Sequence, residues 1–258
     1  MRLMKRILSA AAVLALSASL LVGCSSGTAS SVPVSASSAA ESTVSSVEET
    51  ASSAVDENEA AAAQLLNDLT GSYQELWPVI LADEYKQTWL DDCTALVGED
   101  NAEAAFEKLP SMVTGDVYGE DAVKAYANGG GAYFCGFTNS LAILTFDGET
   151  STISGTDKDG NVLFSHAYHY IGMEPVRGLY EFESDDADSG EFTYFFLAPD
   201  TSAETYHIEF RYGSDAEALS QYDTGEYAYW LASGISTDCD QTMIDNCIEL
   251  FCTENLAG

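Results

Sequence analysis

Apolar and polar positions change their spacing near the middle of this 258-residue chain. Before about residue 130, apolar positions recur three or four residues apart, which is typical of amphipathic helices. After Gly131, short runs rich in Tyr, Phe, Ile and Thr follow one another, separated by turn sequences such as Phe146-Asp147-Gly148. This pattern predicts eight strands, near Ala132–Phe137, Leu141–Phe146, Thr152–Thr156, Val162–Ile171, Gly178–Glu183, Phe192–Leu197, Tyr206–Tyr212 and Tyr227–Ala232.

The other periodic segments predict helices on either side of the strands. Consecutive strands joined by short turns favour an antiparallel meander, which can close into a small barrel with room for one ligand. An open sandwich is the alternative. The predicted fold is therefore mainly β, an antiparallel β-barrel with N-terminal helical segments and a C-terminal helix. The predicted helices lie near Glu57–Leu69, Tyr73–Cys93, Ala102–Leu109, Glu120–Ala127 and Asp240–Phe251.

The first residues follow the pattern of a bacterial lipoprotein signal. Arg2, Lys5 and Arg6 precede an apolar stretch, Ile7 to Leu21, that is short for a transmembrane helix. The sequence Leu-Val-Gly-Cys at its end then predicts cleavage before Cys24 and a lipid on the Cys24 thiol. We therefore expect an extracytoplasmic protein, anchored to the bacterial cell membrane through that lipid alone. An uncleaved membrane anchor is the alternative.

Composition divides the chain into three parts. Residues 24–59 are mostly Ser, Ala, Val, Thr and Glu, and such a segment buries too little apolar surface to fold. We therefore predict a signal peptide over residues 1–23, a flexible tether over residues 24–59 and one folded domain over residues 60–258.

The chain is strongly acidic, with 42 Asp and Glu against 9 Lys and Arg and a formal net charge of -33. Such a field repels nucleic acid and anionic lipid headgroups, so both are excluded as partners, and it concentrates cations near the surface. The sequence contains no Gly-rich phosphate loop and no Gly-x-Ser-x-Gly elbow, which predicts a protein that is not an enzyme. Five cysteines follow Cys24, and their pairing cannot be read from the sequence.

Three groups of residues resemble one known family. The segment from Gly71 to Ile80 has Gly, an aromatic, Gln, an aliphatic, an aromatic and Pro followed by two aliphatics. The sequence His207-Ile208-Glu209 is followed by Gly213-Ser214-Asp215, and an aromatic cluster of Tyr227, Tyr229 and Trp230 precedes the last predicted helix. Together they resemble the ZinT/YodA family of bacterial metal-binding proteins over roughly residues 69 to 251.

The resemblance implies a lipocalin-like (calycin) barrel that holds zinc, or another divalent cation, near one mouth through three histidines. This chain departs from that pattern at two positions. Phe195 stands at the place of the first histidine and cannot bind a metal, while Glu209 stands at the second of the paired histidines. A carboxylate can bind zinc, although less selectively than imidazole. A different register would match His207 to the second paired histidine and Thr205 to the first.

Three histidines are available, and all fall in predicted strands. His207 and Glu209 are two positions apart, so they share a strand face and could bind one ion together if that face is the barrel interior. His166 and His169 differ by an odd number, so a regular strand turns only one of them inward. We predict His169, which lies nearer the strand end, as the replacement third ligand.

Two functional hypotheses follow. In the first, the protein is a ZinT-like lipoprotein that binds a divalent metal, zinc before others, and passes it to a zinc ABC uptake system, as the resemblance implies. In the second, the metal site has decayed, and the barrel binds a small apolar ligand or an envelope protein partner. Phe195 favours the second hypothesis, and the pair of His207 and Glu209 favours the first.

Overall fold

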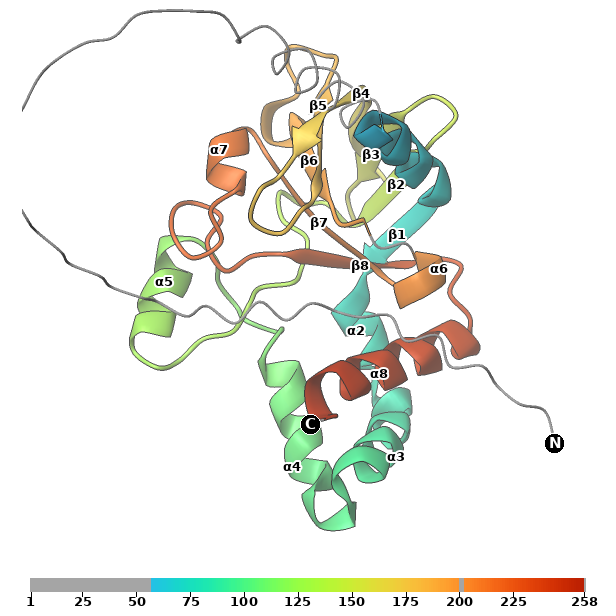
Figure 1. The fold of residues 1–258 in the computed structure, drawn as a ribbon, viewed down its shortest axis with the longest axis vertical. Coiled ribbons are helices and arrows are strands. Elements are labelled where there is room, and N and C mark those ends of the chain that lie inside the picture. The colour runs from blue at the N-terminus through green and yellow to red at the C-terminus, as the bar shows by residue number, and fades with distance from the viewer. Residues whose placement is uncertain (1–56, 200–201, 258) are drawn as a thin grey trace, which may run out of the picture. The chain divides into compact units, whose positions relative to one another are not determined.

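Eight antiparallel strands close into a barrel in the computed structural model, which describes residues 57–199 and 202–257 (Figure 1). Each strand pairs with the next one along the chain, and β1 pairs with β8 to close the ring. The predicted meander is therefore confirmed, and it is a closed barrel rather than an open sandwich. The strands are β1 Gly71–Glu75, β2 Ile143–Asp147, β3 Thr152–Thr156, β4 Val162–Met173, β5 Tyr180–Ser184, β6 Tyr194–Leu197, β7 Ile208–Gly213 and β8 Ala232–Ser236.

Aromatic rings fill the barrel interior. Phe195 of β6 is fully buried, with its ring centroid 5.7 Å from that of Phe164 and 5.4 Å from that of Tyr168, both on β4. Because β4 and β6 are not neighbours in the sheet, these rings meet inside the barrel. Phe195 also stacks on Tyr212 of β7 at 5.4 Å. Because side chains alternate along a strand, Tyr212 and every second residue of β7 before it point inward, and the residues between them point outward.

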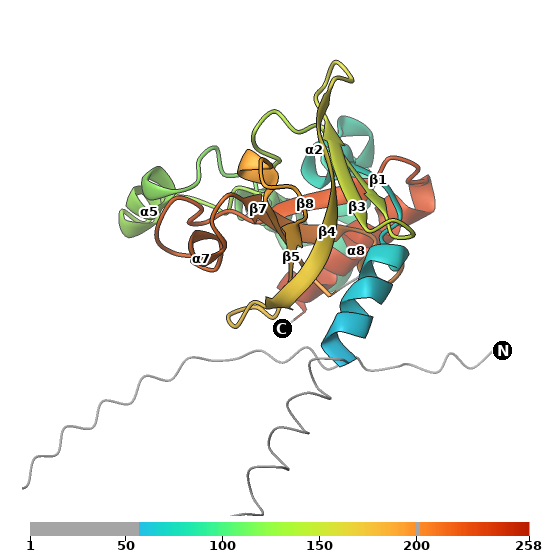
Figure 2. The same ribbon diagram turned by 90° about the horizontal axis from the view of Figure 1, so that it is seen from above.

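Helices lie on the outside of the barrel and at its ends. Figure 2 places α5 and α7 on one side of the strands and the helix of residues 57–68 on the other. A second hydrophobic core joins α2, α3, α4 and α8 to the outer face of β8 through Ile235. The labelled helices are α2 Leu76–Ile80, α3 Lys86–Val97, α4 Glu99–Ser111, α5 Glu120–Ala127, α6 Ser202–Thr205, α7 Ala216–Leu219 and α8 Gln241–Leu256, with short 3-10 turns at Asp83–Tyr85 and Gly190–Phe192.

Three predicted elements are wrong. The start of the predicted helix Tyr73–Cys93 is strand β1, because Gly71–Glu75 pairs with β2 and β8 to close the barrel. The segment Ala132–Phe137 is no strand, and Phe134 makes only isolated bridges to Thr114 and Trp230. The run Tyr227–Ala232 is irregular, since Tyr229 has a φ of 56° that interrupts extended backbone.

Part of the predicted organisation lies outside the described residues. Cys24, the predicted signal peptide and most of the predicted tether belong to residues 1–56 and stay predictions. Within the described residues, no helix is both long enough and apolar enough to span a bilayer.

Candidate metal site

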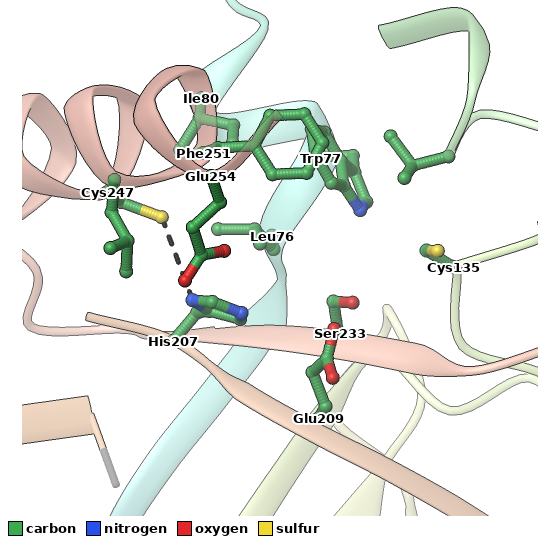
Figure 3. Close-up of a pocket in the computed structure, with 12 residues that line it drawn as sticks. Leu76, Trp77, Ile80, Cys135, His207, Glu209, Ser233, Cys247, Phe251 and Glu254 are labelled. Carbon is green, nitrogen blue, oxygen red and sulfur yellow. Dashed lines mark hydrogen bonds between the residues drawn. The ribbon is translucent and has the colours of Figure 1, made fainter. Parts of the chain in front are cut away.

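A small cavity of about 90 Å³ lies between the outer wall of the barrel and the helices beside it (Figure 3). Strands β7 and β8 contribute one wall, and α2 and α8 contribute the opposite wall. Polar groups from both walls therefore face one enclosed space. The lining residues are Leu76, Trp77, Ile80, Val113, Cys135, His207, Glu209, Ser233, Cys247, Leu250, Phe251 and Glu254.

His207 is held in one orientation by the turn before β7. Tyr206 has a φ of 65°, which bends the chain so that Thr205 and His207 come together. His207 Nδ1 lies 2.7 Å from the Thr205 carbonyl oxygen, and Thr205 Oγ1 donates to the His207 carbonyl oxygen at 2.9 Å. Because a carbonyl oxygen can only accept, Nδ1 carries the proton, and in the neutral ring Nε2 keeps a free lone pair. Figure 3 shows this second nitrogen turned toward the side where Ser233 and Glu209 lie.

Glu209 shares the cavity with His207, as their spacing predicted. The shared face is the outer face of β7, however, because Ile208, Phe210 and the other even-numbered positions belong to the barrel core. The cavity is thus a gap between barrel and helices, and the condition that the shared face point into the barrel interior is not met. Glu254 of α8 brings a second carboxylate to the lining, and Figure 3 shows it directed toward His207.

Two thiols complete the polar lining. Cys247 Sγ lies 4.0 Å from His207 Nδ1. The carbonyl oxygen of Cys135 accepts a hydrogen bond from Ser233 N, which holds Cys135 beside β8. Burial, and next the charge of Glu254, raises the pKa of Cys247 to about 12. Burial, and next the charge of Glu209, raises the pKa of Cys135 to about 12. Both thiols are therefore protonated near neutral pH, and a metal would have to displace a proton to bind either sulfur.

Trp77 directs its indole N–H to the part of the cavity that holds the Cys135 thiol, whose pKa it lowers. Its side chain is almost fully buried, and no nitrogen or oxygen atom of the described residues accepts a hydrogen bond from Nε1. In Figure 3 this nitrogen is directed to the side of the cavity where Cys135 and Ser233 lie. Sulfur is a weak acceptor, so a stronger acceptor bound in the cavity would be stabilised by this N–H group.

His169 does not join this site. Strand pairing places His169 opposite Glu183, Glu183 opposite Tyr194, and Tyr194 opposite Gly213 at the far end of β7. His169 is thus three strands away from His207 and about 20 Å further along the strand direction. Its Nδ1 lies 2.7 Å from Asp185 Oδ1 on the surface.

His166 is likewise at that end of the barrel. Its Nδ1 lies 2.6 Å from Asp186 Oδ2, and its ring stacks on the inward-facing Phe164. Over residues 57–199 and 202–257, no group of three or more His, Cys, Asp or Glu side chains is arranged to hold a metal ion. The three predicted ligands His207, Glu209 and His169 are therefore not brought together as a set.

Sequence reasoning missed the contribution of the helices. A helix was predicted over Asp240–Phe251, yet nothing in the sequence indicated that Cys247 and Phe251 of this helix would lie against His207. Trp77 belongs to the segment that carries the family resemblance, but its environment depends on closure of the barrel by β1. The missing information in each case is a contact between residues far apart in the chain.

No family model matches the chain, and no curated protein matches it. Among solved structures, the chain is similar to the Zn(II)-bound ZinT-like domain of Streptococcus pneumoniae AdcA, with 16% identity, a TM-score of 0.44, and coverage of 72% of this chain and 89% of that domain. It is also similar to Zn(II)-bound AdcA from Streptococcus pneumoniae, with 14% identity and a TM-score of 0.41. Both are zinc-bound structures. The second match spans 75% of this chain and 35% of AdcA.

Proposed function

We propose that this chain is an extracytoplasmic lipoprotein that binds a divalent metal ion, zinc before others, in the cavity between the barrel and α8, and assists its uptake as a carrier. The observation that carries the proposal is the orientation of His207. Its Nδ1 is fixed by the Thr205 carbonyl, and Nε2 is left for a ligand on the wall that also holds Glu209. A histidine that ligates a metal usually has its other ring nitrogen fixed in this way.

The donor set fits a transported cation better than a permanent structural metal. The imidazole of His207 and the carboxylate of Glu209 share a wall, and no third His, Cys, Asp or Glu of the described residues is arranged to complete a metal-binding group with them, so coordination positions would remain for water. Structural zinc sites are closed by four protein ligands, whereas open positions allow a metal to be exchanged. The net charge of -33 also raises the local concentration of cations around the protein.

The barrel interior offers less support for the apolar-ligand hypothesis. Phe195, Phe210 and Tyr212 are fully buried and pack on one another or on neighbouring rings. An apolar ligand would have to displace these contacts, each of them worth about 0.5–1.5 kcal/mol beyond the area it buries.

Calorimetric titration of metal-free, full-length protein with zinc tests the proposal. We expect one-to-one binding that His207→Ala and Glu209→Ala each weaken at least tenfold, or by about 1.4 kcal/mol. His169→Ala is the matched control, because it removes an imidazole on β4, three strands away from His207. The zinc affinity of this variant should equal that of the wild type. Weak binding at many sites, equal in all four proteins, would mean that the acidic surface alone attracts the metal and that the proposal is wrong.

Replacement of the nearest thiol should have little effect on zinc affinity. The raised pKa of Cys247, about 12, means that a zinc–sulfur bond must be formed at the expense of the thiol proton. We expect Cys247→Ser to change the dissociation constant for zinc at pH 7 by less than threefold in the same titration. A loss of a hundredfold or more would instead identify Cys247 as a ligand.

A further inference from the structure

Among the five cysteines that the structure describes, the sulfur atoms of one pair are in contact. Cys93 Sγ of α3 and Cys252 Sγ of α8 lie 4.0 Å apart, and both side chains are fully buried. The two residues are 159 positions apart in the chain, so the packing of α3 on α8 brings them together. Each sulfur lies on a regular helix, which fixes the backbone on both sides of the pair.

We propose that Cys93 and Cys252 form a disulfide bond in the mature protein, which joins α3 to α8 and fixes the helical wall of the cavity. A separation of 4.0 Å is van der Waals contact between two thiols, and a bond of about 2.05 Å needs only side-chain rotation and a small approach of the helices. With this pairing, Cys135, Cys239 and Cys247 remain as thiols.

The bond would form by thiol–disulfide exchange with a disulfide-bonded oxidant outside the cytoplasm. The thiolate of one cysteine attacks the oxidant and releases one of its two sulfurs as a thiol. The thiolate of the second cysteine then attacks this mixed disulfide and releases the other sulfur, so two protein thiols become one disulfide and the oxidant becomes two thiols. Burial raises the pKa of both Cys93 and Cys252, so thiolate is scarce in the folded state. The exchange therefore takes place before α3 and α8 pack together.

The link would matter for the cavity because α8 carries part of its wall. Cys247, Leu250, Phe251 and Glu254 lie on α8 within one or two turns of Cys252. Joining Cys252 to α3 restrains the rotation of α8 and keeps those side chains opposite His207. The proposal does not depend on metal binding, and failure of one would leave the other untouched.

Peptide mapping of full-length protein tests the bond. The protein is exported, alkylated at lysis, purified in detergent and digested without reduction. We expect a cross-linked peptide pair that contains Cys93 and Cys252, with Cys135, Cys239 and Cys247 alkylated. Cys239→Ser is the matched control, because it removes a partly exposed thiol and should leave the cross-link intact. Alkylation of both Cys93 and Cys252, in exported protein and again after refolding with oxidised glutathione, would overturn the proposal, as would a cross-link between other cysteines.

A thermal measurement provides the second readout. A disulfide between Cys93 and Cys252 closes a loop between residues 159 positions apart. In the chain-entropy model a loop of this length stabilises a protein strongly, so we expect reduction of the wild type to lower Tm by about 10 °C or more. Reduction should not change the Tm of the double variant Cys93→Ala/Cys252→Ala. If that variant does not fold, the wild type with and without reductant still gives the comparison. An equal Tm for oxidised and reduced wild type would count against the bond.

Discussion

Replacement of Arg211 by methionine should lower the free energy of unfolding by about 3–5 kcal/mol, one of the largest effects expected of a single substitution in this domain. Arg211 lies on the outer face of β7, two residues beyond Glu209, and is fully buried. Its guanidinium group donates to the carbonyl oxygens of Leu219, Gln221 and Tyr227 and lies 4.4 Å from the ring centroid of Tyr222. These bonds hold the loop between β7 and β8 against the barrel.

Two opposing contributions decide whether Arg211→Met lowers or raises the free energy of unfolding. Methionine removes a buried charge, whose desolvation lowers the pKa of Arg211 and opposes folding. It also leaves the buried carbonyl oxygens of Leu219 and Tyr227, and the part-buried one of Gln221, without this donor. At about 1–3 kcal/mol for each buried oxygen, this second contribution is the larger one. Arg177→Met is the matched control, since Arg177 also lies over Tyr222, at 4.6 Å, but is exposed. Chemical denaturation should give a loss of about 1 kcal/mol or less for Arg177→Met. Equal losses for the two variants would contradict this account of Arg211.

Phe195→His, which introduces a histidine where the resemblance in sequence implies one, should destabilise the barrel without improving zinc binding. Phe195 is fully buried among Phe164, Tyr168 and Tyr212. A histidine there would lose ring contacts and bury polar nitrogens without partners, at a cost of about 3 kcal/mol. Its side chain would also point into the barrel, while His207 and Glu209 face the helices on the other side of the wall.

Denaturation and zinc titration of the same variant check both parts of this prediction. Phe195→Leu is the control for packing alone and should cost only about 1–2 kcal/mol, since leucine keeps the site apolar. A zinc affinity for Phe195→His tenfold above that of the wild type would show that residue 195 reaches the metal, and the assignment of the cavity would then be wrong.

Much of the barrel could be predicted from local sequence signals. Strand β3 and helix α5 have the predicted bounds, because alternation and turn residues set the first and helical spacing sets the second. Strand β1 was mistaken for the start of a helix, since only its pairing with β8 makes Gly71–Glu75 extended. The aromatic run Tyr227–Ala232 resembles a strand, yet its rings serve the core, where Trp230 packs on Tyr212. The predicted strand Ala132–Phe137 is thus irregular, the predicted strand Tyr227–Ala232 is displaced to β8, and β1 was not predicted as a strand.

The candidate site was less predictable than the fold. A spacing of two residues places His207 and Glu209 on one strand face, but it does not say whether that face points into the barrel or outward. The decision depends on Phe210 and Tyr212 entering the aromatic core, which a single strand does not reveal. His169 could not be placed either, because its distance from His207 follows from the register of three successive strand pairs. That His207 and Glu209 bind a metal stays a prediction.

The most direct test of the central claim is anomalous diffraction at the zinc absorption edge, from crystals of the protein grown with one equivalent of zinc. We expect one strong anomalous peak in the cavity between β7 and α8, about 2.0–2.1 Å from His207 Nε2 and within bonding distance of a Glu209 oxygen. A peak beside His166 or His169 and the acidic residues that pair with them, with His207 free of metal, would contradict it.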